Sequence, residues 1–187
     1  NEPGRAGHFA RSFSDGDKIL FRGMTSSQYQ LPLYPFSPEC DYSKEKEVIH
    51  EGKHSAEVYA DACIRFLEGQ TENEQPFFAY VAFQTPHDPR EAPDKFREMY
   101  KDDEMELPAS FLPQHPFYNG MLNIRDENLA GFPRTPGEVK KQIADYYAMV
   151  SHDDYQIGRI MDALQKSGKF DNTIIVFASD NGLAVGK

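Results

Sequence analysis

The stretch Thr173-Ile174-Ile175-Val176-Phe177-Ala178-Ser179, followed by Asp180-Asn181-Gly182, decides the fold expected for this chain. Four consecutive large apolar residues, three of them β-branched, stand between polar turn residues. This pattern is typical of a short strand buried on both faces, which usually belongs to a parallel sheet. Open parallel sheets bind ligands just beyond the carboxyl ends of their strands. The sequence therefore predicts a ligand site at Asp180 and Asn181.

The side chains at this strand end suit a hard cation. Asp180 and Asn181 offer carboxylate and amide oxygens, which Ca²⁺ and Mg²⁺ prefer, and Gly182 lets the chain turn without a Cβ clash. Asn-Gly is also a strong signal of a tight hairpin turn. A turn that binds nothing is therefore the alternative interpretation of the same residues.

Length and composition limit the function classes. The 187 residues suffice for one domain with a core, or for a large part of a bigger domain. Because 30 acidic residues exceed 20 Lys and Arg, the net charge is −10, and we expect neither a nucleic acid nor a membrane surface as partner. The chain does not begin with Met, so we expect an excerpt of a longer protein. Cys40 and Cys63 have no zinc-type spacing and define neither a disulfide nor a compartment.

The N-terminal part, residues 1–53, is expected to be irregular. It is rich in Gly, Ser, Pro and aromatic residues up to position 38, with one apolar cluster at 19–21 that could form a short pairing. Pro32, Pro35 and Pro38 argue against a central strand there. Residues 39–53 are predicted to be a solvated linker.

Residues 54–187 predict an α/β arrangement. Ser55 caps a helix with apolar residues at helical spacing that ends at Gly69, and residues 76–83 form an unbroken apolar run, interpreted as a second buried strand. The capping box at 135–138 starts a long helix that ends at Gly168. This alternation predicts a mainly parallel sheet flanked by helices.

Two further features follow from the helical phase and from missing periodicity. Asp154 falls on the apolar stripe of the long helix, either as a paired structural carboxylate or as the cap where the helix breaks. His152 and Asp153 are expected to face solvent. The long loop at 101–135 is either a lid or binding loop, or a connector packed on its own aromatic residues.

A second polar group follows the apolar run at 76–83. In Gln84-Thr85-Pro86-His87-Asp88-Pro89, two prolines hold a histidine and an aspartate in a stiff loop. By itself, His87 could be a surface-loop histidine without a function. This loop and Asp180-Asn181-Gly182 are expected at the same edge of the sheet, and together they are more specific than either alone.

With these motifs the chain resembles the sulfatase family, within the alkaline-phosphatase-like superfamily of metal-dependent hydrolases. The resemblance rests on three stretches: 77–83 with Thr85-Pro86-His87-Asp88-Pro89, 144–150 with Gln156-Ile157-Gly158-Arg159, and 171–177 with Ser179-Asp180-Asn181-Gly182. It implies that residues 1–187 are part of one alkaline-phosphatase-like catalytic domain.

The resemblance implies hydrolysis of sulfate esters. In sulfatases a formylglycine, made from the Cys or Ser of a Cys/Ser-x-Pro-x-Arg motif, attacks sulfur as a hydrated diol, and a divalent cation binds the diol and the sulfate oxygens. By similarity, Asp180 and Asn181 would be two ligands of that cation, usually Ca²⁺ and alternatively Mg²⁺. His87 would be the catalytic residue that donates a hydrogen bond or a proton to the leaving alcohol. A sulfated small molecule or glycan as substrate and a periplasmic or extracellular location also follow from the resemblance.

The chain also departs from the family pattern. Neither Cys40 nor Cys63 lies in a Cys-x-Pro-x-Arg context and no Ser version is present, so the formylglycine is expected in a part of the protein outside this chain. The family's paired acidic ligands and its Lys-x-His element are absent, and Lys187 lies nearer to Asn181 than the family's catalytic lysine does. We therefore expect the fragment alone to be inactive. The alternatives are a phosphodiesterase or phosphonate monoester hydrolase of the same superfamily, and a non-catalytic binding module.

Overall fold

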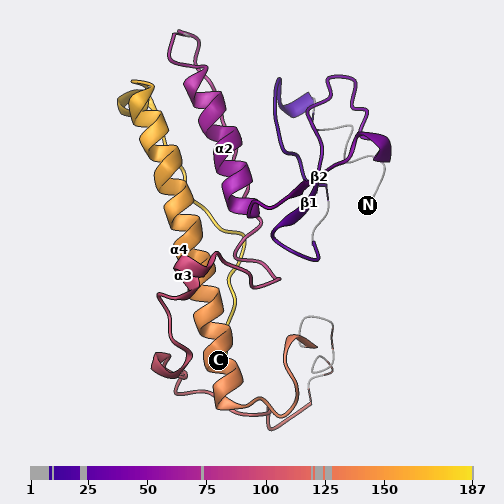
Figure 1. Cartoon of the computed structure of the whole chain (residues 1–187), viewed down its shortest axis with the longest axis vertical. Helices are drawn as coiled ribbons and strands as arrows, with labels where there is room; N and C mark the ends of the chain where they lie inside the picture. The colour runs from indigo at the N-terminus through magenta and orange to yellow at the C-terminus, as the bar shows by residue number, and fades with distance from the viewer. Residues whose placement is uncertain are drawn as a thin grey trace. The chain divides into compact units, whose positions relative to one another are not determined.

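The computed structural model describes residues 9, 11–21, 25–72, 74–118, 120, 124 and 128–186 (Figure 1). Lys187 lies outside the described residues. None of the helices in the described part of the chain is both long and apolar enough to cross a membrane. The helices and strands in chain order are β1 (Gln30–Leu33), η1 (Lys44–Lys46), β2 (Val48–Glu51), α2 (Ser55–Glu68), α3 (Asp94–Arg97), η2 (Asp102–Glu104), α4 (Pro136–Lys166) and η4 (Phe170–Asn172).

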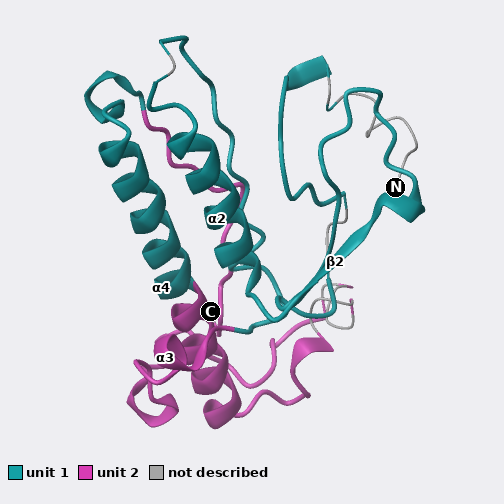
Figure 2. Ribbon diagram, turned by 45° about the horizontal axis from the view of Figure 1, so that its top comes forward, with its two compact units in different colours: residues 1–91, 150–174 teal, residues 92–149, 175–187 magenta. Residues whose placement is uncertain are grey.

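The chain divides into two compact units, coloured separately in Figure 2. Unit 1 comprises residues 1–91 and 150–174, and unit 2 comprises residues 92–149 and 175–187. Helix α4 contributes its N-terminal part to unit 2 and its C-terminal part to unit 1.

The sheet of unit 1 pairs β1 with β2 antiparallel, and Pro32 lies opposite Ile49. An isolated bridge between Ile19 and Tyr34 confirms the short pairing expected near residues 19–21. Pro32 is tolerated because each strand of a two-stranded sheet has a free edge. The linker predicted over 39–53 is solvated at β2, where Val48 and Ile49 are 52% and 50% exposed, but the chain forms a paired strand there instead of an irregular connection.

The core of unit 1 joins this sheet to α2, which begins at Ser55 and is followed by Gly69, as predicted. The cap is His54 and not Ser55: the Nδ1 of His54 accepts a hydrogen bond from the N–H of Ala56 at 3.2 Å. The hydroxyl of Ser55 instead contacts Gln28. Four buried side chains form the core cluster: Leu31, Leu33, Val58 and Tyr59.

Helix α4 begins at the predicted capping box, where the N–H of Glu138 donates to the side chain of Thr135 at 3.3 Å. The helix continues to Lys166 as one uninterrupted element of 31 residues. Gly168, with φ of +73°, follows its end and supplies the left-handed conformation that favours glycine there.

The predicted phase of α4 is wrong around residues 150–157. Asp154 is exposed, whereas His152 and Asp153 are only 1% and 8% exposed. Since its side chain is exposed, Asp154 is not a buried carboxylate. Because the helix continues through this position without a break, Asp154 is not a helix cap either. Sequence reasoning followed the largest apolar residues, but the buried face uses small, flexible or hydrogen-bonded ones: Ala148, Met149, His152, Asp153 and Gln156.

The two apolar runs expected to be buried strands have no regular secondary structure, and neither pairs as a strand in the described part of the chain. Phe78 in the first run is 78% exposed, and Ile174 in the second is 93% exposed. The mainly parallel sheet is therefore not confirmed, since the sheet among the described residues is the antiparallel pair β1–β2. A strand buried on both faces needs neighbours at its edges and layers over its faces. Apolar composition encodes the preference for burial but not those partners.

Unit 2 is held by ion pairs on the N-terminal part of α4. The Nε of Arg97, at the end of α3, donates to Oδ1 of Asp145 at 2.5 Å, and the Nζ of Lys141 lies 2.5 Å from Oδ2. Arg97 also pairs with Asp102 in η2. The described residues of the loop at 101–135 contain neither α-helix nor strand, as predicted. Its role as lid or connector stays a prediction.

Candidate functional site

His87 lies in unit 1, in the loop of residues 84–91, which we call the His87 loop. Its imidazole is exposed, and Nδ1 lies 3.0 Å from the carbonyl oxygen of Asp88. A carbonyl oxygen can only accept, so this contact places a proton on Nδ1 and leaves Nε2 to interact with a ligand. Pro86 and Pro89 both follow cis peptide bonds.

The backbone of the His87 loop is bound by a fully buried side chain from before β1. The Nε2 of Gln28 donates to the carbonyl oxygens of His87 at 3.1 Å and Pro89 at 3.4 Å. At the end of the loop, Oε2 of Glu91 accepts from the Gln28 N–H at 2.6 Å and from the Ser27 hydroxyl at 2.7 Å. The N-terminal segment thus supplies the donors that hold this loop.

A second attachment joins the loop to α4. The hydroxyl of Thr85 donates to Oδ1 of Asp153 at 2.5 Å, and both side chains are buried. Burial raises the pKa of Asp153 to about 7, although the hydrogen bond from Thr85 acts in the opposite direction. Asp153 therefore changes charge near neutral pH.

His54 links the loop to the start of α2. Its Nδ1 accepts from the N–H of Ala56, and its Nε2 lies 2.9 Å from the carbonyl oxygen of Glu91. These partners together require the neutral tautomer with the proton on Nε2. Burial lowers the pKa of His54, which favours the same neutral form. The ring packs edge-on against His152, with centroids 4.4 Å apart.

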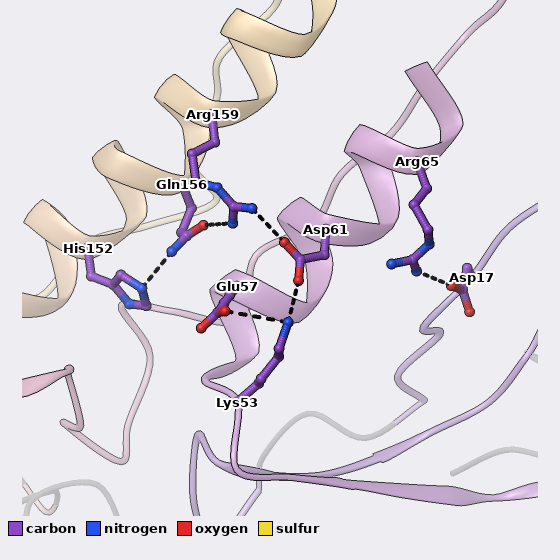
Figure 3. A network of polar contacts seen from close by, with 8 residues as sticks. All are labelled: Asp17, Lys53, Glu57, Asp61, Arg65, His152, Gln156 and Arg159. Carbon is purple, nitrogen blue, oxygen red and sulfur yellow. Dashed lines mark hydrogen bonds and ion pairs between the residues drawn. The ribbon is translucent and has the colours of Figure 1, made fainter. Parts of the chain in front are cut away.

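The polar network in Figure 3 fastens α2 to the C-terminal part of α4 within unit 1. The side chain of Gln156 contacts two neighbours: its Nε2 lies 2.9 Å from the ring nitrogen Nε2 of His152, and its Oε1 accepts from the guanidinium of Arg159 at 2.7 Å. The same guanidinium donates to Oδ1 of Asp61 in α2 at 2.8 Å. Lys53 pairs with the other oxygen of Asp61 at 2.8 Å. Burial would raise the pKa of Asp61, but the hydrogen bonds from Lys53 and Arg159 keep it below its ordinary value. The helix that carries Asp153 is thereby held against α2.

Asp180 and Asn181 lie in unit 2, in an exposed segment with short-range hydrogen bonds. The N–H of Asn181 donates to Oδ1 of Asp180 at 2.9 Å, and the hydroxyl of Ser179 donates to the Asn181 carbonyl at 2.5 Å. In the described part of the chain no strands flank Asn181-Gly182, so the hairpin turn left open by the sequence does not form.

The donors at Asp180 and Asn181 fit a hard cation in kind but not in number. Carboxylate and amide oxygens are the groups that Ca²⁺ and Mg²⁺ bind, yet Ca²⁺ takes roughly six to eight oxygens. Among the described residues, no cluster of three or more His, Cys, Asp or Glu side chains is arranged to hold a metal ion. Further ligands would have to come from other parts of the protein. The convergence of this pair with His87 stays a prediction, because the two belong to different units.

Comparison with protein families matches residues 13–187 of this chain to the sulfatases. The chain belongs to the sulfatase family. It is 33% identical over 143 residues to an arylsulfatase of Clostridium perfringens and 31% identical over 150 residues to an arylsulfatase of Klebsiella aerogenes. These matches cover 73% and 74% of this chain, but 28% and 32% of the two relatives. The chain thus spans about a third of the length of these sulfatases.

The fold agrees with this assignment. The crystal structure of yidJ, a candidate sulfatase of Bacteroides fragilis, matches with a TM-score of 0.66 at 24% identity, over 91% of this chain and 33% of that one. This likeness supports the alkaline-phosphatase-like fold expected for a sulfatase. The mainly parallel sheet of that fold is the part that the described residues of this chain do not form.

Sequence reasoning located His87 in this sulfatase chain but missed the residues that hold its loop. Gln28 and His87 are 59 positions apart, and Thr85 and Asp153 are 68 apart, so no local pattern connects them. One signal was available, a carboxylate on the inward face of the long helix. The phase error assigned that signal to Asp154 instead of Asp153.

Proposed function

We propose that the full-length protein containing this chain is a sulfuric ester hydrolase that acts on a sulfated small molecule or glycan. The match of residues 13–187 to the sulfatase family carries the proposal, because the matched region includes both the His87 loop and Asp180-Asn181. The similarity to two arylsulfatases supports it. A periplasmic or extracellular location is proposed on the same resemblance.

His87 is proposed as the catalytic residue at the leaving group. Its Nδ1–H is directed to the Asp88 carbonyl, so the exposed Nε2 is the nitrogen that can hold a transferable proton. When the bond between sulfur and the ester oxygen breaks, that oxygen takes the proton from Nε2 and departs as a neutral alcohol. The ring that remains is the neutral Nδ1–H tautomer, which keeps its hydrogen bond to Asp88.

A divalent cation, Ca²⁺ or alternatively Mg²⁺, is proposed at Asp180 and Asn181. Their oxygen donors have the chemistry that these cations prefer, and both residues are exposed. When bound, the cation would neutralise charge on the sulfate group. Such a local positive charge would favour an anionic substrate, since this chain by itself carries a net charge of −10.

The nucleophile is proposed to be a formylglycine hydrate contributed from outside residues 1–187, which would supply the oxygen that attacks sulfur. The two cysteines of this chain do not suit that role. Neither Cys40 nor Cys63 lies in the required motif. Burial also raises the pKa of Cys63 to about 11, so its thiol stays protonated at neutral pH.

The test compares three 4-nitrophenyl esters on the full-length protein: 4-nitrophenyl sulfate, the phosphate diester bis(4-nitrophenyl) phosphate and 4-nitrophenyl phenylphosphonate. We expect the sulfate to be turned over fastest, and His87→Ala to lower its kcat by roughly 10²- to 10⁴-fold. His50→Ala is the control, because His50 lies in β2 of the same unit and its ring contacts Lys18 rather than the His87 loop, so kcat should be unchanged.

Each other result selects an alternative. Faster turnover of the phosphate or phosphonate ester would establish the phosphodiesterase or phosphonate monoester hydrolase. Absence of turnover with all three esters would favour the non-catalytic binding module. An unchanged kcat in His87→Ala would remove His87 from the mechanism.

A further inference from the structure

We propose that Gln28 is a positioning residue that fixes the His87 loop and, through it, the imidazole of His87. This inference rests on the catalytic role proposed for His87. Gln28 is 0% exposed and lies 59 positions before His87 in the sequence. A polar side chain that is fully buried needs partners for each of its polar atoms. The partners of Gln28 are the carbonyl groups of the loop and the start of α2.

The hydrogen bonds of Gln28 determine how its amide is oriented. Nε2 points to the carbonyl oxygens of His87 and Pro89, which can only accept, so the NH₂ group must occupy this position. Oε1 lies 2.7 Å from the hydroxyl of Ser55, which can donate to it. A flipped amide would lose both donations to the loop.

The His87 loop needs donors from outside itself. Pro86 and Pro89 have no N–H, which removes two of the donors that a loop normally uses to bind its own carbonyl groups. Within the loop, the N–H of His87 donates to the Gln84 carbonyl at 3.1 Å, and that of Glu91 to the Pro89 carbonyl at 2.9 Å. The His87 carbonyl takes its donor from Gln28.

These bonds reach the imidazole through a single intervening peptide. Gln28 holds the carbonyl groups of His87 and Pro89, on either side of Asp88. The carbonyl of Asp88 between them is the acceptor for Nδ1 of His87. Fixing its two neighbours therefore fixes the acceptor that sets both the tautomer and the direction of the ring.

Gln28 is itself attached to a rigid element. Its carbonyl oxygen accepts from the N–H of Ser55 at 2.7 Å, at the first residue of α2. Its own N–H donates to Glu91 at 2.6 Å, so the residue bridges the helix start and the end of the loop. Because the backbone of Gln28 is bonded both to α2 and to Glu91, its side chain has a fixed starting point from which it can hold the loop in place.

The test is a double-mutant cycle in the full-length protein, with kcat and KM for 4-nitrophenyl sulfate as readouts. Gln28→Glu keeps the size of the side chain but removes both side-chain donors. We expect kcat to fall on the order of 10²-fold, the effect of a small misplacement of a catalytic group, with a smaller change in KM. In the His87→Ala background, Gln28→Glu should cause no further loss, because Gln28 acts through His87.

Ser55→Ala is the milder variant, and it decides the question if Gln28→Glu fails to fold by circular dichroism. It removes the hydroxyl that orients the amide but keeps the backbone hydrogen bond to Gln28. We expect a smaller loss of kcat that also disappears in the His87→Ala background.

Gln156→Glu is the matched control, since Gln156 is 3% exposed in unit 1 and bonds to His152 and Arg159 rather than to the loop. The factor by which Gln156→Glu changes kcat should be the same in the wild-type background and in the His87→Ala background. If Gln28→Glu and Ser55→Ala also lower kcat by the same factors in the His87→Ala background as in the wild type, the positioning role of Gln28 is overturned. If His87→Ala alone leaves kcat unchanged, the catalytic role proposed for His87 fails instead, so the two failures are distinct.

Discussion

The His87 loop and the segment that carries Asp180 and Asn181 hold their functional side chains in opposite ways. The loop is bound by residues 37 to 68 positions away, among them the buried side chains of Gln28, His54 and Asp153. The hydrogen bonds at Asp180 and Asn181 join neighbours within two positions, and both residues are exposed. This chain, about a third as long as its relatives, thus contains the residues that hold His87. Its described residues do not include the further ligands that a cation at Asp180 and Asn181 would need.

Because of this difference, substitutions in the two regions should affect stability and activity to different extents. A side chain that lies inside a buried hydrogen-bond network cannot be changed without leaving polar partners unsatisfied. An exposed ligand makes few contacts that the fold depends on, so its removal should affect the bound cation and little else. Variants in the two regions should therefore have different ratios of lost activity to lost stability.

The largest expected effect is on activity in the Asp180 segment. Asp180→Ala in the full-length protein should lower cation-dependent turnover by roughly 10³-fold, on the scale of several kcal/mol that a bound cation supplies to catalysis. The free energy of unfolding should change by less than about 0.5 kcal/mol, because the side chain is exposed. Turnover with and without added Ca²⁺, together with urea denaturation, checks both parts. Activity that persists after chelation would contradict the cation site.

The next effect is a pH dependence of stability at Asp153. Its pKa is about 7 in the folded protein, above its ordinary value of 3.8, so the folded state keeps a proton that the unfolded state loses. The contribution of this group to stability is therefore fully present below pH 4 and is lost as the pH rises through 7. In the wild type this should lower the free energy of unfolding by roughly 4 kcal/mol between pH 4 and pH 8, from a shift of about three pKa units, and Asp153→Asn should abolish that decrease. The free energy of unfolding is measured by urea denaturation at each pH. The same pH dependence in the wild type and in the variant would argue against a buried, protonated carboxyl.

A somewhat smaller loss is expected from Glu91→Ala. The change removes the acceptor for the N–H of Gln28 and the hydroxyl of Ser27, and it should destabilise the protein by about 2 kcal/mol. Glu72→Ala is the control, because Glu72 is an exposed carboxylate of the same unit. Equal midpoints of denaturation for the two variants would show that Glu91 does not hold the loop.

The smallest effect is expected from Ser179→Ala. It removes the hydrogen bond from the Ser179 hydroxyl to the Asn181 carbonyl in the exposed segment, and the free energy of unfolding should change by less than about 0.5 kcal/mol. Thermal unfolding of the full-length protein measures this. A clearly larger loss would mean that the segment is packed as firmly as the His87 loop, and the contrast between the two regions would disappear.

Several signals that act over a few residues were predicted correctly from the sequence, although the cap of α2 proved to be His54 and not Ser55. The Thr135 capping box and the glycines at 69 and 168 mark helix ends through contacts within one turn. The His87 loop was found because Pro86 and Pro89 flank His87 and Asp88 in the sequence. Gln28 and Asp153 were missed because their roles depend on which distant segments meet, which no single-residue pattern encodes. The apolar runs at 76–83 and 173–179 were assigned burial for the same reason, since their composition says nothing about their partners.

The hydrogen bonds from Gln28 end on main-chain oxygens, so the loop is held independently of its own side chains. Asp88 and Arg90, which pair with each other at 3.0 Å, can be replaced without removing an acceptor that Gln28 uses. Residues beside the imidazole are therefore open to variation while its backbone support is retained. Libraries that diversify positions 88 and 90 with residue 28 kept as glutamine offer a route to altered substrate preference in this sulfatase.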